Sequence, residues 1–263
     1  MRVLAIDTST LLGGVAIVDE LSGVVVEVRL NVKSTHSERL MTTIDYALQQ
    51  SGYTISDMDV FAVATGPGSF TGLRIGLSTV KGLSYATGKP IVSVPTLEAL
   101  ARNFPFCRYP VCTMLDARKK EIYAALFEWR NDGFIRLINE MSVKVQDFLK
   151  KLEENNPSAP PYVPPYQGGI KRGTKGEVGG FSDGKIVFTG DGAILYRDEI
   201  VSHMGERAVF ASPEKMAPSP ANVACIGIQK ALIGEFSEPV NLVPFYLRRS
   251  EAEIKAKSEE PRA

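Results

Sequence analysis

The sequence of 263 residues has few of the residues on which disulfide-bonded and metal-binding proteins depend. Its three cysteines, Cys107, Cys112 and Cys225, are odd in number and form no C-x-x-C pair, so neither a disulfide framework nor a zinc site is indicated. The two histidines, His36 and His203, lie far apart, and no H-x-x-x-H or H-E-x-x-H motif occurs. Reduced, buried thiols and no metal site are expected.

Net charge and long apolar runs are also lacking. Thirty basic and thirty acidic residues cancel, so no overall field attracts nucleic acid or an anionic membrane. Contact with RNA would then need a local patch or a partner. No stretch approaches the roughly 18 apolar residues that a membrane span needs. Asp7 interrupts the short apolar run at the start, which differs from a signal peptide. A soluble, cytoplasmic protein without membrane contact is expected.

The predicted elements follow one order twice along the chain. Apolar runs predict ten short strands, at residues 2–7, 15–20, 24–30, 60–65, 90–94, 110–115, 121–128, 134–140, 186–189 and 208–211. Apolar residues at helical spacing predict helices at about 36–51, 70–87, 96–102 and 145–154, with a helix-like stretch after the ninth strand. Thr35 to Glu38 form a capping box for the first helix, and Gly52 ends it.

Two coincidences indicate that the repeated order is a duplication. LAID and TMLD each end a first strand in aspartate, and ATGPG and FTGDG each end a fourth strand in Thr-Gly-X-Gly. A strand-strand-strand-helix-strand-helix unit gives a mixed sheet flanked by helices. The sequence therefore predicts an α/β protein with a duplicated actin-like (ASKHA, ribonuclease H-like) fold and two five-stranded sheets. That fold alone does not determine a function.

Three regions are expected along the chain. The first lobe takes residues 1–105, the second lobe takes residues 106–215, and a C-terminal extension with a charged tail takes residues 235–263. A helix at about 219–234 is expected to pack back on the first lobe. Residues 155–183 contain five prolines and six glycines but almost no aliphatic residues, so they are expected to form a flexible insertion.

The glycine-rich stretch 64-ATGPGSFTGLRIG-76 fails the two specific phosphate-loop motifs. Both the P-loop and the dinucleotide fingerprint, started at Gly66, require a glycine where Thr71 stands. Pro67 also removes a backbone N–H that a phosphate would use. A tight turn followed by a helix remains, and Ser69 or Thr71 can cap that helix.

The predicted helix at 70–87 carries a second stripe at helical spacing, formed by Gly72, Gly76, Thr79 and Leu83. Each interior glycine costs roughly 1 kcal/mol relative to alanine. A helix that keeps such glycines indicates close approach to its backbone, either by its own sheet or by a helix of a partner. The pattern leaves both alternatives open.

Two aspartate turns are the strongest candidates for chemistry. In the actin-like superfamily the turn equivalent to Asp7-Thr8-Ser9-Thr10 faces the nucleotide phosphates, and Asp116 holds the matching place in the second half. Ala117-Arg118-Lys119-Lys120 follows Asp116, where a kinase usually has glycine. The cleft is then either degenerate or specialised, and Asp7 as an ordinary turn residue stays an alternative. No G-x-S-x-G motif supports serine catalysis.

Motifs in the right order along nearly the whole chain resemble the TsaB (YeaZ) family. They are MRVLAIDTST, HSERLMTTIDYAL, AVATGPGSFTGLRIGLSTVKGLSYA, VPTLEALA, LDARKKEIYAALF, TGDGA and VPFYLR. The GPGSFTGLRIG string is highly specific. The sequence departs from the family pattern in the insertion at 155–183 and in its charged tail.

The resemblance implies a non-catalytic, bacterial scaffold subunit in the synthesis of N6-threonylcarbamoyladenosine in tRNA. It implies a TsaD-like partner that transfers the threonylcarbamoyl group, a TsaE-like ATPase in the assembly, a homodimer when the chain is alone, and tRNA bound through the complex. ATP and magnesium would be used by the complex, with no cofactor assigned to this subunit.

The resemblance also implies which residues take part. Partner contact falls on the helices at 36–51 and 70–87, with the candidate residues His36, Met41, Asp45, Leu48, Gly72, Arg74, Gly76, Thr79, Lys81 and Leu83. A vestigial nucleotide cleft or TsaE contact falls on Asp7, Thr8, Thr10, Asp116, Arg118 and Asp191. The rival interpretations are an actin-like ATPase or kinase that uses Asp7 and Asp116, a glycoprotease-like hydrolase, and a homodimeric structural protein outside any RNA pathway.

Overall fold

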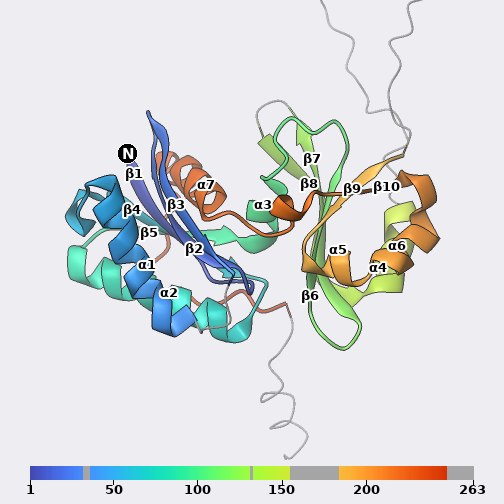
Figure 1. Ribbon diagram of the computed structural model, residues 1–263, viewed down its shortest axis with the longest axis horizontal. Coiled ribbons are helices and arrows are strands. Elements are labelled where there is room, and N and C mark those ends of the chain that lie inside the picture. The colour runs from blue at the N-terminus through green and yellow to red at the C-terminus, as the bar shows by residue number, and fades with distance from the viewer. Residues whose placement is uncertain (32–35, 131–132, 155–183, 248–263) are drawn as a thin grey trace, which may run out of the picture.

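The computed structural model describes residues 1–31, 36–130, 133–154 and 184–247, and it forms two lobes that each contain a five-stranded sheet (Figure 1). The expected insertion at 155–183, the charged tail and Thr35 of the expected capping box lie outside the described residues. No helix among the described residues is long and apolar enough to cross a membrane.

The sheet of the first lobe has the strand order β3-β2-β1-β4-β5. Its strands are β1 (Arg2–Asp7), β2 (Gly13–Asp19), β3 (Gly23–Leu30), β4 (Val60–Gly66) and β5 (Ile91–Pro95). The first three are antiparallel neighbours, whereas β4 runs parallel to both β1 and β5. Strand β4 is buried along its whole length, which explains its unbroken apolar sequence.

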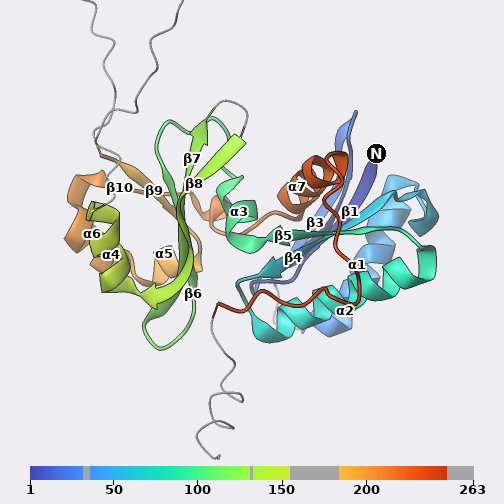
Figure 2. The same cartoon turned by 180° about the vertical axis from the view of Figure 1, so that it is seen from behind.

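Helices cover both faces of this sheet. α1 (His36–Ser51) and α2 (Phe70–Thr87) pack on one face, and α7 (Pro220–Leu232) packs on the other (Figures 1 and 2). The side chain of Ser69 accepts a hydrogen bond from Gly72 N at the start of α2, and Gly88 ends the helix in the left-handed conformation.

The second lobe repeats the arrangement with the strand order β10-β9-β6-β7-β8. Its strands are β6 (Val111–Asp116), β7 (Glu121–Arg130), β8 (Gly133–Lys144), β9 (Ile186–Thr189) and β10 (Ala208–Phe210). One face of the sheet is covered by α4 (Val145–Glu154), α5 (Asp191–Leu195) and α6 (Arg197–Met204). The two sheets have equivalent strand orders, which confirms the predicted duplication and actin-like fold.

The short helix α3 (Thr96–Ala101) lies between the lobes and packs on strands of both. Arg136 of β8 forms an ion pair with Glu98 of α3. After α3, the Asn103 amide donates hydrogen bonds to the carbonyls of Lys215 and Ala217 at 3.1 and 2.9 Å. These contacts join α3 to the second lobe and hold the segment after α3 against the segment that leads from β10 to α7.

The residues from 233 to 247, here called the C-terminal strap, return along the first lobe after α7 (Figure 2). Ser237 N donates to the Ile91 carbonyl at the open edge of β5, at 2.8 Å. Further along, Phe245 N donates to the Thr65 carbonyl at 2.7 Å. The strap therefore protects an edge strand and reaches the end of β4.

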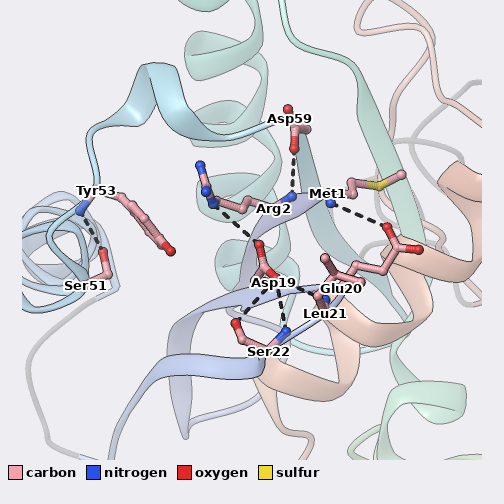
Figure 3. A network of polar contacts seen from close by, with 9 residues as sticks. All are labelled: Met1, Arg2, Asp19, Glu20, Leu21, Ser22, Ser51, Tyr53 and Asp59. Atoms are coloured by element: carbon pink, nitrogen blue, oxygen red, sulfur yellow. Dashed lines mark hydrogen bonds and ion pairs between the residues drawn. The ribbon is translucent and has the colours of Figure 1, made fainter.

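A polar network fastens the opposite end of the first sheet (Figure 3). Asp59 accepts a hydrogen bond from Arg2 N at 2.7 Å, and the Arg2 Nε lies 3.4 Å from an oxygen of Asp19. Hydrogen bonds from the backbone amides of Ser22 and Leu21 lower the pKa of Asp19. The network aligns β1 with the β2–β3 turn at this end.

Candidate functional site

The first aspartate turn folds into the interior of its own lobe. Asp7, Thr8 and Ser9 are each 1% exposed. Both the amide and the hydroxyl of Ser9 donate to Asp7 Oδ1, at 2.8 and 2.6 Å. An aspartate that orients the turn after its own strand makes this kind of contact.

The glycine-rich stretch covers this turn from outside. Ser69 N donates to the Ser9 carbonyl at 2.7 Å, and the Thr8 hydroxyl donates to the Gly72 carbonyl at 2.7 Å. A Cβ atom on Gly68 would lie 2.3 Å from the Ser9 carbonyl oxygen. The start of α2 therefore packs directly on this turn and covers it.

The two glycines of the predicted stripe make their close approach within the same chain. A Cβ atom on Gly72 would lie 1.9 Å from the Thr8 carbonyl oxygen, and one on Gly76 would lie 2.4 Å from the Thr8 hydroxyl. Both glycines are buried. Their assignment to a partner's helix is therefore corrected: the backbone that approaches them belongs to the β1–β2 turn.

Thr10, the last residue of the turn, is less buried than the three residues before it. It is half-buried, and its hydroxyl donates to the Leu12 carbonyl at 2.8 Å. Leu11 beside it is 73% exposed. Three residues of the predicted first turn, Asp7, Thr8 and Ser9, are thus buried, and Thr10 is half-buried.

The second aspartate turn brings three predicted residues together in the other lobe. Asp191 Oδ1 accepts a hydrogen bond from Asp116 N at 3.0 Å, and Asp116 Oδ1 accepts one from Arg118 N at 2.9 Å. Gly190 makes this possible, since a Cβ atom there would lie 1.9 Å from the Met114 carbonyl oxygen. The TGDG motif therefore anchors the loop before α5 against β6.

Three consecutive residues of this turn, Arg118, Lys119 and Lys120, have φ angles of 66°, 55° and 62°. Left-handed backbone is unfavourable for residues with a Cβ atom, by roughly 1–2 kcal/mol each. All three side chains are exposed. The turn therefore presents a strained basic tip, and backbone strain of this kind is concentrated at functional positions.

Burial raises the pKa of Asp191, and the charge of Asp116 raises it further, against the opposing hydrogen bonds from the Asp116 and Gly192 amides. The folded protein therefore holds this proton more tightly than the unfolded chain, whose carboxyl titrates near 3.8. As the pH rises from 3.8 through the folded pKa, ionisation of Asp191 lowers the free energy of unfolding.

Asp191→Asn is accordingly expected to increase the free energy of unfolding at neutral pH. The asparagine oxygen still accepts the hydrogen bond from Asp116 N, whereas the partly desolvated negative charge beside Asp116 is removed. Urea denaturation at neutral pH and at a pH below 3.8 tests this. At the lower pH the Asp191 carboxyl is protonated in both the folded and the unfolded protein, so the gain in stability should vanish. An equal gain at both pH values would contradict the explanation.

A separate cavity of about 540 Å³ lies between the lobes. The strap, the ends of β4 and β5, and Arg136 and Glu140 of β8 line it. Arg136 is paired with Glu98, and Lys230 on the rim is paired with Glu235 at 2.6 Å. Neither aspartate turn lines this cavity, so it does not correspond to the predicted nucleotide cleft.

The predicted partner-binding residues lie on α1 and α2, on the side of the first lobe that faces away from α7. Met41, Asp45 and Arg74 are exposed. Four others are half-buried: Leu48, Thr79, Lys81 and Leu83. His36 begins α1, but its side chain lies outside the described residues.

Several exposed residues of this face were not predicted from the sequence. Tyr46 of α1 and Tyr85 of α2 are 51% and 66% exposed. Ser78, Gly82 and Ala86 form an exposed row of small residues along α2. No atom lies within 4 Å of the place where a Cβ on Gly82 would be. Because these small residues recur every fourth position from Ser78, the sequence could have indicated that they share one side of the helix.

The strap meets the amino end of this face. Tyr246 stacks on Phe70 with ring centroids 4.9 Å apart, and its hydroxyl accepts a hydrogen bond from Arg74 Nε at 3.1 Å. The guanidinium of Arg74 also lies 3.9 Å from the centre of the Phe70 ring. Arg74 is therefore held in position by the last described residues of the chain.

Comparisons with known proteins agree in pointing to one pathway. Residues 16–256 match the family described as TsaD, tRNA N6-adenosine threonylcarbamoyltransferase. The tRNA threonylcarbamoyladenosine biosynthesis protein TsaB of Bacillus subtilis is 29% identical over 97% of each chain. The tRNA N6-adenosine threonylcarbamoyltransferase of Kosmotoga olearia is 33% identical, over 50% of this chain and 45% of its own.

A solved structure from Pseudomonas aeruginosa, described as an uncharacterized protein with similarity to the peptidase YEAZ, has the same fold. It superimposes with a TM-score of 0.70 at 23% identity and covers 94% of this chain and 99% of its own. The likeness extends over both lobes, because nearly the whole of each chain is matched.

Proposed function

Because the chain belongs to the TsaD family, in its TsaB (YeaZ) group, and so takes part in tRNA threonylcarbamoyladenosine biosynthesis, we propose that it is the scaffold subunit of that pathway. In this role it carries out no transfer itself. It binds a TsaD-like subunit through α1 and α2 and holds that subunit in its active arrangement, with a TsaE-like ATPase and tRNA joining the assembly.

The observation that carries this proposal is the closure of the first aspartate turn by the start of α2. Phosphoryl transfer depends on groups that reach the phosphates directly. Here Asp7 is 1% exposed and accepts two hydrogen bonds from Ser9. The same contacts that close the turn also fix α2 in place, so its outer face becomes a rigid surface for another protein.

The outer face of α1 and α2 has the composition of a protein interface. Tyrosine, methionine and arginine are enriched at such surfaces, and this face exposes Tyr46, Tyr85, Met41 and Arg74. The row of small residues along α2 allows a second helix to approach. Two helices from each subunit would then form a four-helix contact, either with a TsaD-like partner or with a second copy when the chain is alone.

The second aspartate turn has a different part in this proposal. Arg118, Asp116 and Asp191 form a connected cluster under an exposed basic tip. This surface suits a contact with the TsaE-like ATPase, which would bring ATP and magnesium to the complex. A nucleotide bound by this subunit alone would need both turns, and Asp7 of the first turn is 1% exposed.

Light scattering during size-exclusion chromatography tests the proposal, with the chain alone and mixed with its cognate TsaD-like protein. A stable peak that contains both chains is the expected result. A chain that elutes unchanged in the mixture would contradict the scaffold role.

Calorimetric titration with Mg-ATP addresses the ATPase or kinase alternative. We expect no stoichiometric binding by the isolated chain, because Asp7 is 1% exposed and its turn is covered by the start of α2. Tight one-to-one binding would favour the kinase interpretation. Hydrolysis of a peptide substrate in the same preparation would favour the glycoprotease-like interpretation.

A further inference from the structure

A group of aromatic side chains lies where the segment between the lobes meets the ends of β7 and β8. The rings of Phe106 and Trp129 have centroids 5.0 Å apart, and the rings of Trp129 and Phe134 are also 5.0 Å apart, edge to face. Trp129 and Phe134 are partners across the two strands. These three residues are called the aromatic cluster.

Phe106 is the unusual member of the cluster. Its side chain is 81% exposed, so burial contributes little to holding it there. Its backbone has a φ angle of 60°, which is uncommon for a large residue without a special reason. Strained backbone that presents an exposed ring indicates a function rather than a requirement of the core.

An exposed arginine follows Phe106 closely in the chain. Arg108 is exposed two residues later, and its guanidinium lies 4.6 Å from the centre of the half-buried Tyr109 ring. Arg136 lies 5.9 Å from the centre of the Phe127 ring, which is itself buried and stands edge-on to Phe134. Exposed aromatic rings and exposed arginines are the side chains on which proteins stack unpaired RNA bases.

We infer that the aromatic cluster binds unpaired bases of tRNA by stacking, with Phe106 as the exposed ring and the exposed Arg108 two residues further along the chain. This inference rests on the proposed function, which brings tRNA to the complex, and it adds a direct contact by this chain. A local contact of this kind would let a chain of zero net charge touch RNA directly.

The charges around the cluster determine how this binding depends on salt. Arg136 is paired with Glu98, and Arg130 is paired with Glu128 at 2.6 Å. Few positive charges are therefore left to neutralise phosphates, and the affinity should fall only slightly as salt increases. A basic patch of several unpaired lysines would give a steep dependence.

The protein contains a natural probe for this contact. Trp129 is the one tryptophan of the sequence, and it touches Phe106. Titration of the full chain with a short RNA hairpin that has an unpaired loop should quench its fluorescence. A fully paired RNA duplex of similar length should not quench it, because its bases are already stacked.

Phe106→Asn is the informative variant. Asparagine adopts the left-handed conformation readily but has no ring to stack, so the fold is kept. Loss of one stacking contact should weaken hairpin binding by about 5- to 100-fold. Phe106→Tyr should retain binding. Phe236→Ala, at an exposed phenylalanine of the strap, is the matched control and should have no effect.

The outcomes separate this inference from the proposed function. Quenching by the hairpin that Phe106→Asn abolishes would support the inference, even if the chain ignored a TsaD-like protein. Equal quenching by the duplex, a steep salt dependence, or unchanged binding by Phe106→Asn would overturn it. In those cases a stable complex with a TsaD-like protein would leave the scaffold role intact.

Discussion

Gly72→Ala is expected to lower the free energy of unfolding by about 3 kcal/mol, which is a large effect for the addition of one methyl group. The new Cβ atom would lie 1.9 Å from the carbonyl oxygen of Thr8. That oxygen belongs to the backbone of a turn that is 1% exposed, so it cannot rotate away as a side chain would. Either α2 or the β1–β2 turn would have to move.

Urea denaturation followed by circular dichroism measures this loss. Gly82→Ala is the matched control on the same helix, because no atom lies within 4 Å of its Cβ position. It should increase stability by up to about 1 kcal/mol, since alanine favours helix over glycine. Equal stability of the two variants would show that the start of α2 is not packed rigidly on the turn.

Gly82→Gln is expected to weaken binding of a TsaD-like protein by at least about 30-fold while the subunit stays folded. Glutamine forms helix well, Gly82 is exposed, and no atom lies within 4 Å of its Cβ position. Its side chain would, however, stand in the row of small residues through which a partner helix approaches. The effect should therefore appear in assembly and not in stability.

Analytical ultracentrifugation of the mixed subunits, with thermal unfolding of the variant alone, tests this second expectation. Ser202→Gln places the same side chain at an exposed position of α6 in the other lobe, so it should leave assembly unchanged. Normal assembly by Gly82→Gln would move the contact away from the middle of α2.

Much of the fold could be predicted because local signals agree with tertiary structure. The helices expected at about 36–51 and 70–87 have these bounds in the structure. A cap and Gly52 mark the first one in the sequence, and a cap with apolar spacing marks the second. Strand bounds were less accurate. The eighth strand continues beyond 140 to Lys144, where it pairs with Glu121. Pairing across strands is decided by a distant segment, which a local pattern does not contain.

The start of the second strand was also predicted inaccurately, because it too depends on distant segments. It begins at Gly13 instead of residue 15, and a Cβ atom on Gly14 would lie 2.2 Å from the Val28 carbonyl oxygen. Two adjacent glycines read as a turn when only the sequence is considered. Their actual role depends on β3 and α7, which are packed around them.

The candidate site was predictable in its parts but not in its arrangement. Asp7, Asp116 and Asp191 were recognised as ends of equivalent strands and turns, and the structure places them there. The spacing of Gly72 and Gly76 showed that something approaches α2 closely. It could not show that Thr8, which lies 64 residues earlier in the chain, is what approaches. Gly82 was overlooked because it belongs to a different side of the helix.

The return of α7 and the strap to the first lobe also determines the order in which the protein can be completed during synthesis. One face of the first sheet stays uncovered until residues 220–232 have been synthesised, and the edge of β5 stays unpaired until Ser237 has been synthesised. The strands of the second lobe leave the ribosome before them. The lobe that is translated first is thus finished last, and until then it exposes an uncovered apolar sheet of the kind that chaperones bind.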